Sequence, residues 1–514
     1  MERKSRLARE ILIAGVTLGV LGDALLRAGP WSLNLTLWAT LVVFAAMTLA
    51  GRNHVAWPRD GLWFAAPVLL FALAFAWRDS LALKFLNLVA MLTGISVWSL
   101  ALAGSRISIS GIADYARGMV DSGAAALIGA TALARSELIQ TAPPSSATLR
   151  HARAATVGLL IAVPLLFVFG GLLMAADAVF DRMVTTALDI DFANLMSHGM
   201  LTGFFAWIVC GFFLLILGVA RPFRAEMIKI GRPPLGVTEI ALPLALIDLL
   251  FAAFVLVQMR YLFGDAALVQ DTVGLTYAEY ARRGFFELVT VTALVLPLLL
   301  AADWILGPSS ALGKRLFRGL AGAMLALLLI IVASAMTRMQ LYQDAYGLTE
   351  LRLYTTAFMA WLGIVLAWFA VTVLAGRRRF FATGALLAAF SLVGALNLIN
   401  ADEIIARVNT TRAIEGKEFD ARYASSLSAD AVPVLLSALP RLEEEHRCIV
   451  AARLLERWSP PTATDWRTWN VARGRAWRSV RRASDRLERS ACSAESRRER
   501  DADHDAEAAD ATSG

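Results

Sequence analysis

Long apolar segments constrain this chain more than any other feature, because they recur along its first four-fifths. The hydrocarbon core of a bilayer is about 30 Å thick, and a helix needs roughly 20 apolar residues to cross it. The chain is therefore expected to be an all-α, polytopic transmembrane helix bundle with about eleven spans. The candidate spans cover approximately residues 11–29, 32–50, 61–77, 81–103, 155–176, 199–220, 235–258, 284–305, 317–336, 355–375 and 381–399.

The composition supports this expectation, since 58% of the residues are hydrophobic and 18% are charged. Soluble domains are typically about 45–50% apolar and about 25% charged. The first span lacks a clear cleavage site and is expected to remain as an anchor. Cysteine is sparse, and because Cys210, Cys448 and Cys492 form no CxxC pair, neither a disulfide framework nor a metal site is expected.

The distribution of Lys and Arg predicts the orientation of the spans. With eleven spans and the N-terminus in the cytoplasm, the inner segments hold 21 Lys and Arg and the outer loops hold 8. Positive charge is enriched in cytoplasmic loops, so this assignment is favoured. The C-terminal tail then lies outside the cytoplasm. One span more or fewer would invert all later loops and remove the difference in Lys and Arg between inner and outer segments.

Loops and changes of composition predict five regions. A four-span segment (1–103) is followed by a cytoplasmic amphipathic loop (104–154) and a seven-span core (155–400). An extramembrane helical hairpin is expected over 401–460, with one helix capped by Ser428 and another from Arg441 to Trp458. Residues 461–514 are expected to form an Arg- and Trp-rich helix, with Trp466, Trp469 and Trp477 near one face, and a disordered acidic tail.

Two outer loops share the tripeptide Gly-Leu-Thr, at residues 274–276 and 347–349. Thr276 with Glu279 three residues later matches a capping box. Thr349 can cap the next helix likewise, and Glu350 is favourable in its first turn. Thr276 and Thr349 are therefore predicted structural caps.

Charged residues near these caps allow two interpretations. Glu279, Arg283 and Glu287 are spaced so that they line one helical face, where opposite charges attract. The simpler interpretation is a cap with an interfacial anchor, since charges near helix ends often extend toward water. The functional one is an outward-facing site for a polar or anionic ligand, built from Arg260, Glu279, Arg283, Glu287, Arg338, Glu350 and Arg352.

Of the acidic residues in the seventh and eighth spans, Glu239 and Asp303 lie near span ends and only Asp248 lies deep. Such residues usually face the interior of a bundle and can mark an ion or proton path. Asp248 is therefore the candidate residue of a transport path.

Three segments resemble a bacterial multi-pass membrane family known only as a domain of unknown function. They are YAEYARRGFFEL (277–288), AYGLTELRLY (345–354) and NADEIIARVN…LSADAVPVLL (400–436). The resemblance covers roughly residues 160–440 and implies a cytoplasmic-membrane protein without established activity, so no catalytic residue is transferred. The extension after Arg457 departs from the family pattern.

The motifs of nucleotide-binding proteins, zinc proteases and serine hydrolases are missing from the sequence, and no cofactor or metal is predicted.

The leading hypothesis is a non-enzymatic envelope protein that binds a ligand or partner at its outer face. The alternative is a transporter or ion-coupled permease, and a membrane-embedded transferase comes third. Besides the lipid bilayer, the tail is expected to contact anionic lipid, an envelope polymer or an envelope protein. Nucleic acid is not favoured, because residues 401–514 hold 19 Lys and Arg against 20 Asp and Glu.

Overall fold

The computed structural model describes residues 2–55, 63–102, 115, 118–120, 122–125, 192–217, 236–262, 285–306, 311–461 and 463–491. Within these ranges all regular structure is helical. Among the described residues, eight helices are long and apolar enough to cross a membrane. The expected span at 155–176 lies entirely, and the expected amphipathic loop at 104–154 mainly, outside the described residues. The helices before residue 400 are α1 (Glu2–Leu26), α2 (Leu33–Arg52), α4 (Ala65–Trp77), α5 (Leu81–Leu102), α9 (Phe192–Ile216), α10 (Val237–Leu262), α13 (Phe285–Leu306), α14 (Ala311–Tyr346), α15 (Glu350–Phe369) and α16 (Phe381–Ile399).

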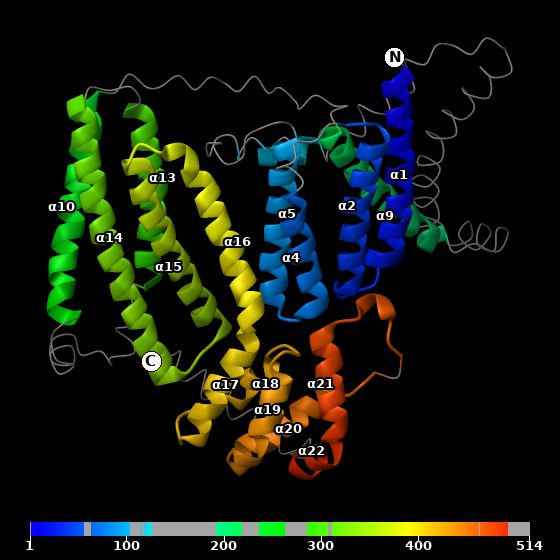
Figure 1. Cartoon of the computed structure of the whole chain (residues 1–514). Coiled ribbons are helices and arrows are strands. Elements are labelled where there is room, and N and C mark those ends of the chain that lie inside the picture. Colours follow the sequence, from blue (N-terminus) through cyan, green and yellow to red (C-terminus); the bar gives the residue numbers. More distant parts are fainter. Residues whose placement is uncertain are drawn as a thin grey trace, which may run out of the picture.

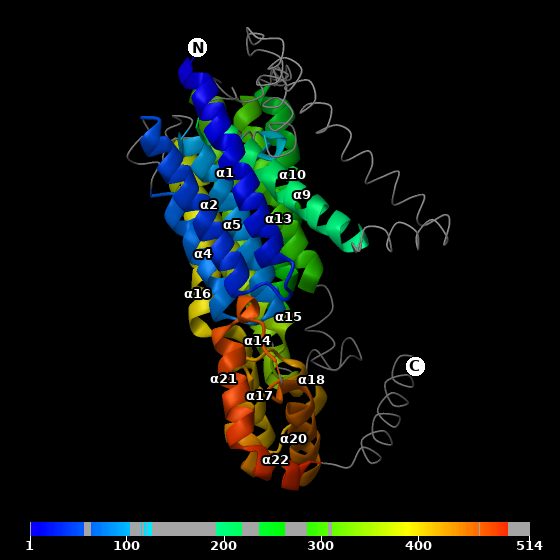
Figure 2. The ribbon, with the colours of Figure 1, turned by 90° about the vertical axis from the view of Figure 1, so that its right-hand side faces the viewer.

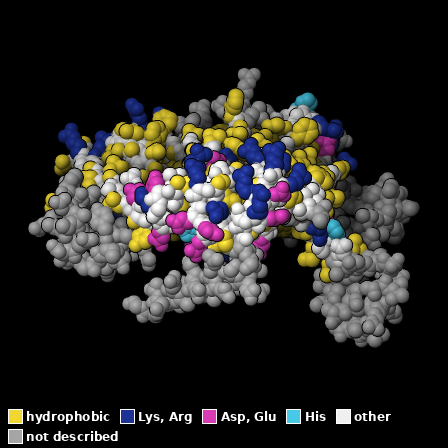
Figure 3. Space-filling model, turned by 90° about the horizontal axis from the view of Figure 1, so that it is seen from below, with side chains coloured by type: hydrophobic (Ala, Val, Ile, Leu, Met, Phe, Trp, Pro, Cys, Tyr) yellow, Lys and Arg dark blue, Asp and Glu magenta, His cyan; other side chains and the backbone are white. Residues whose placement is uncertain are grey.

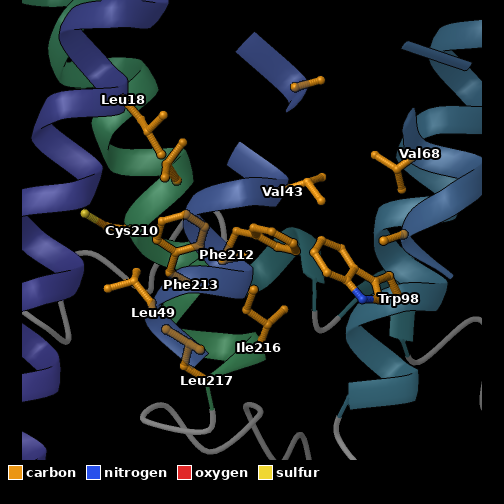
Figure 4. Packing of buried hydrophobic residues seen from close by; sticks show 14 of the residues in the cluster. Leu18, Val43, Leu49, Val68, Trp98, Cys210, Phe212, Phe213, Ile216 and Leu217 are labelled. Carbon is orange, nitrogen blue, oxygen red and sulfur yellow. The ribbon is translucent and has the colours of Figure 1, made fainter. Parts of the chain in front are cut away.

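The first group of helices, α1, α2, α4, α5 and α9, shares one apolar core. Figure 4 shows Trp98 of α5 and Phe212 of α9 near its centre, with ring centroids 5.8 Å apart. Helices α1 and α9 pack closely because α1 presents glycine at Gly15 and Gly19. A Cβ atom at Gly19 would lie 2.5 Å from the carbonyl oxygen of Thr202. Small residues at this spacing let two helix backbones approach, as is common in membranes.

The second group, α10, α13, α14 and α15, has its own core. Helix α16 lies between the two groups (Figure 1). Its first residue, Phe381, packs in the second core, whereas Phe390 packs against the first. The two groups are therefore bridged by α16.

The lengths of α4 and α14 differ from those of the expected spans. Helix α4 has only 13 residues where 61–77 was expected, which corresponds to about 20 Å. Helix α14 has 36 residues and extends well beyond the expected 317–336. Its length of about 54 Å exceeds the bilayer core, so one end of α14 extends out of the hydrocarbon.

Residues 401–491 form a compact helical unit, hereafter the C-terminal domain. Segments 401–460 and 461–491 share one core, which includes Leu435, Leu454 and Val480. The helix expected from Ser428 begins at Val432, and Trp466 and Trp469 lie outside the Arg-rich helix that was expected to contain them. The helices are α17 (Ala401–Ile414), α18 (Ala421–Ser426), α19 (Val432–Ala438), α20 (Glu444–Trp458), α21 (Val471–Arg482) and α22 (Ser484–Ser490), with 3-10 turns η4 (Leu439–Arg441) and η5 (Trp466–Thr468).

The C-terminal domain lies at the end of the bundle opposite to the N-terminus of α1 (Figures 1 and 2). The basic end of α1, the start of α14 and the turn carrying Arg377–Arg379 lie at the other end. The surface of the domain is strongly charged, with Lys and Arg gathered on one part and Asp and Glu on another (Figure 3). Helices α21 and α22 contribute exposed arginines at 475, 478, 481, 482, 486 and 489.

The cysteines differ from the expectation. Cys210 is a buried free thiol in α9, but Cys448 in α20 is disulfide-bonded. A disulfide framework was not expected, and this single bond at Cys448 was not anticipated. Sequence spacing gave no indication of it, because a disulfide depends on the distance between two cysteines in the fold.

Candidate functional site

Buried polar side chains meet where the C-terminal domain contacts the ends of the membrane helices. The turn between α4 and α5 supplies Arg78, whose guanidinium lies 3.1 Å from the carboxylate of Asp430. Each of these two residues is 5% exposed. Arg78 also donates to the carbonyl oxygens of Asn397 (2.7 Å) and Leu398 (3.3 Å) at the end of α16. One buried ion pair thus joins the short helix α4, α16 and the C-terminal domain.

Asp79 forms the second set of ion pairs. Its carboxylate accepts hydrogen bonds from Lys84 Nζ (2.7 Å) and from Arg473 Nε (3.0 Å). Arg473 in α21 also donates to Ser32 Oγ before α2, at 2.5 Å. The backbone N–H of Asp79 donates to Asp430 Oδ2 at 2.8 Å. Both sets of ion pairs are therefore connected at the α4–α5 turn.

The C-terminal domain also holds the turn between α14 and α15, which contains the Gly-Leu-Thr tripeptide. Gly347 has φ +74°, a conformation that favours glycine. Thr349 caps α15 by accepting from the N–H of Arg352 at 3.4 Å, as predicted. The Asn409 side chain in α17 pairs with both the N–H and the C=O of Leu348, each at 2.8 Å. The conformation of the turn is thus fixed from both sides.

Glu350 connects this turn to the ion pairs. Its N–H donates to the hydroxyl of Tyr423 at 2.6 Å, and Ser80 Oγ lies 3.4 Å from Glu350 Oε1. Asp402 is 1% exposed, and one of its oxygens accepts from the N–H of Ser428 at 3.1 Å. The other oxygen has no hydrogen-bond partner among the described residues.

The electrostatics of this region follow from burial. Burial raises the pKa of Asp430, while the N–H of Asp79 and the charge of Arg78 oppose the shift. Burial also raises the pKa of Tyr423 to about 12, and the negative charges of Glu350 and Asp402 add to the effect. We call the set Arg78, Asp79, Ser80, Lys84, Glu350, Asp402, Asp430 and Arg473 the junction. It contains four carboxyl groups against three cationic side chains, so its charges do not fully balance.

An open pocket of about 430 Å³ lies beside the junction, between the α14–α15 turn and α17, α18 and α20. Small-molecule sites usually have volumes of about 300–1,000 Å³. Arg352 in its wall donates to the carbonyl oxygens of Tyr346 (3.1 Å) and Gly347 (2.6 Å), and its guanidinium lies over the Tyr342 ring. The other charged lining residues are Glu418, Asp420, Arg422 and Glu445, and the lining also contains His446, Tyr346 and Tyr423.

The structure brings together only some of the predicted ligand-binding residues. Glu350 lies in the junction, and Arg352 and the cap Thr349 line the pocket. Arg338 is partly buried in α14, eight residues before that helix ends. Arg260 lies on α10 and Glu287 on α13, but their side chains are outside the described part, as are residues Thr276, Glu279 and Arg283 altogether.

Asp248 is buried in α10, at 9% exposure. Neither of its carboxylate oxygens has a hydrogen-bond partner among the described residues. No group of three or more His, Cys, Asp or Glu side chains with the geometry of a metal site occurs among the residues that were described.

Sequence reasoning missed most of the junction. Neither Arg78 nor Asp79 was a candidate from sequence, and their partners Asp430 and Arg473 lie more than 350 residues away. One signal was available, because Glu350, Asp402 and Asp430 all lie within the segments that carry the family resemblance. These segments are distant in sequence and meet at the junction.

The apolar helices, the two cores and the domain at one end define a multi-pass membrane protein. The chain belongs to the family described as a domain of unknown function, DUF4153, whose model matches residues 65–438. The resemblance inferred from sequence is thereby confirmed, but the match begins about 95 residues earlier than expected. It runs from the first residue of α4 to the last residue of α19, so Arg78 and Asp430 lie inside it and Arg473 outside. No curated protein and no solved structure matches the chain.

Proposed function

We propose that this protein is a non-enzymatic binding protein of the bacterial cytoplasmic membrane. Its C-terminal domain lies on the extracytoplasmic side and binds a small polar ligand in the pocket at the α14–α15 turn. The observation that carries the proposal is the pocket itself, which has the volume of a small-molecule site and a wall of charged side chains.

Two observations support the extracytoplasmic position of the domain. The predicted inner segments carry the excess of Lys and Arg, and those that are described lie at the end of the bundle away from the domain (Figure 1). The disulfide at Cys448 belongs to the C-terminal domain. Disulfides persist mainly in oxidising compartments such as the bacterial periplasm.

The lining of the pocket favours a ligand with a positive charge and hydroxyl groups. Glu418 and Asp420 are exposed at the pocket, and Glu445 adds a third carboxylate. Arg352 is already bonded to two carbonyl oxygens, so it is less able to bind an anion. A small polyhydroxylated amine fits this chemistry better than the anion that the sequence also allowed.

Calorimetry on the full chain in lipid nanodiscs tests the proposal, with glucosamine as the probe. N-acetylglucosamine has the same ring without the ammonium group and is the comparison ligand. We expect glucosamine to bind more tightly, and Glu418→Gln to weaken its binding about tenfold or more, because a hydrogen bond to a charged group contributes about 1.5–3 kcal/mol. Glu488→Gln, an equal charge change on α22, should leave binding unchanged. The absence of binding by glucosamine, or equal binding by the two sugars, would contradict the proposal.

A second candidate function, ion-coupled transport, is favoured by Asp248. A buried carboxyl group without a partner in an apolar span is costly and often functional. If it carries ions, Asp248→Asn should abolish proton flux into proteoliposomes under an imposed gradient. Glu239→Gln, which lies near the start of the same helix, is the control and should retain the flux. A flux that is unchanged in Asp248→Asn would exclude this role.

A further inference from the structure

The segment between α20 and α21 is held at the level of the membrane helix ends. The N–H of Leu33, the first residue of α2, donates to the carbonyl oxygen of Trp469 at 3.2 Å. Arg467 donates to the carbonyl oxygen of Ala24 in α1 at 2.5 Å. The Asn470 side chain donates to the carbonyl oxygens of Phe75 (2.9 Å) and Arg78 (3.0 Å) at the end of α4. Contacts with three helices of the bundle, α1, α2 and α4, therefore fix the height of this segment.

Two tryptophans on this segment are unusually exposed. Trp466 is 61% exposed and Trp469 is 51% exposed, whereas Trp458 in the core of the same domain is 6% exposed. Trp31, in the turn between α1 and α2, is 41% exposed. Neither Trp466 nor Trp469 has a hydrogen-bond partner for its indole N–H within the described residues. Tryptophan prefers the interface between bilayer and water, where its ring is in an apolar layer and its N–H meets polar lipid groups.

The charge of the segment indicates which lipid it can use. The Arg467 guanidinium is paired with Asp465, with Nη2 at 2.6 Å from Oδ2. This pair makes the segment neutral, so it has no free cation to select an anionic headgroup. The exposed arginines of α21 begin at Arg475, farther along the helix that leads away from the bundle (Figure 1).

We propose that Trp466 and Trp469, together with Trp31, form an interfacial anchor that seats the C-terminal domain on the outer leaflet. The occupant of this surface is phospholipid, with the indole rings at the level of the ester groups and the N–H groups of Trp466 and Trp469 donating to lipid oxygens. The N–H of Trp31 already donates to the carbonyl oxygen of Leu26 at 3.0 Å, so Trp31 contributes its ring alone. Because the anchor is neutral, it binds zwitterionic and anionic phospholipids alike. This inference does not depend on the ligand of the pocket, and only its assignment to the outer leaflet rests on the proposed extracytoplasmic position of the domain.

Quenching of tryptophan fluorescence by brominated lipid tests the anchor in the full chain. The protein is reconstituted in phosphatidylcholine vesicles whose acyl chains carry bromine either near the headgroup or near the chain end. The emission lost in the double variant Trp466→Phe/Trp469→Phe gives the contribution of these two residues. We expect that contribution to be quenched at least twofold by bromine near the headgroup and less by bromine near the chain end. Trp458→Phe is the matched control, and the contribution of Trp458 should not be quenched by either lipid.

Three results would overturn the inference. An unquenched contribution that iodide in the aqueous phase quenches would show that both rings are in water. Stronger quenching by bromine near the chain end would place the rings in the hydrocarbon. Quenching that requires added phosphatidylglycerol would assign the surface to anionic lipid and contradict the neutral anchor. Circular dichroism of the double variant, expected to match that of the parent chain, shows that the comparison is made on folded protein.

Discussion

Replacement of Arg78 by Gln tests the junction, because this side chain connects three parts of the molecule. Its guanidinium contacts Asp430 at 3.1 Å and the carbonyl oxygens of Asn397 and Leu398. Glutamine keeps a polar side chain but removes the charge, so the carboxylate of Asp430 remains buried without its partner. The N–H of Asp79 is then the one donor left to that carboxylate among the described residues.

The expected magnitude follows from burial. Removal of one partner of a buried ion pair typically costs about 3–5 kcal/mol, because the remaining charge stays buried. Both partners are 5% exposed, so screening by water is small. Since about 1.4 kcal/mol corresponds to a tenfold change, the opening of the junction should become about a hundredfold to a few thousandfold more frequent.

Hydrogen exchange followed by mass spectrometry measures this opening. The amide of Asp79 is the direct reporter, because it donates to Asp430 Oδ2. We expect the exchange of this amide to accelerate in Arg78→Gln. It should accelerate less in the double variant Arg78→Gln/Asp430→Asn, because no buried carboxylate is then left without its cationic partner. Arg478→Gln removes an exposed arginine from the same domain and is the control. Equal effects of Arg78→Gln and Arg478→Gln, or a double variant whose effect is the sum of the two single ones, would refute the reasoning.

Three further predictions concern packing, capping and surface charge. Gly19→Ala should destabilise the α1–α9 pair by about 1–3 kcal/mol in thermal unfolding, because its Cβ would meet Thr202, whereas Gly51→Ala, with open space, should not. Thr349→Ala should lower the free energy of unfolding by about 1 kcal/mol because the α15 cap is lost. Thr349→Ser should retain most of that stability in the same assay. Arg478→Glu should stabilise the C-terminal domain by about 0.2–0.5 kcal/mol per relieved repulsion, a gain that disappears at high salt. Three results would each contradict the corresponding argument: destabilisation by Gly51→Ala, unchanged stability in Thr349→Ala, or a gain of stability in Arg478→Glu that does not depend on salt.

Much of the membrane bundle was predictable, because the apolar length needed to cross a bilayer is a local property of the sequence. The start of α15 was also predictable, since the cap at Thr349 depends on residues close in sequence. The full extent of α14 was not predictable from its apolar residues. Its last turns before Tyr346 are polar and leave the bilayer beside the C-terminal domain.

The junction could not be predicted, since its geometry depends on contacts between distant segments. Nothing in the local sequence around Arg78 indicates that it pairs with Asp430. The disulfide at Cys448 was missed for the same reason. The pocket contains Thr349 and Arg352 as candidates from sequence, but its acidic wall at Glu418 and Glu445 required the fold of the C-terminal domain.

The most direct test of the whole account is the side of the membrane on which the C-terminal domain lies. A short epitope inserted after Ser459, at an exposed end of α20, reports on the domain, and one inserted after Arg378 reports on the turn before α16. Spheroplasts of a bacterial host are exposed to an antibody before and after permeabilisation. The account predicts that the tag at Ser459 is reached in intact spheroplasts and the tag at Arg378 only after permeabilisation. Detection of both tags in intact spheroplasts, or of both tags only after permeabilisation, would contradict it.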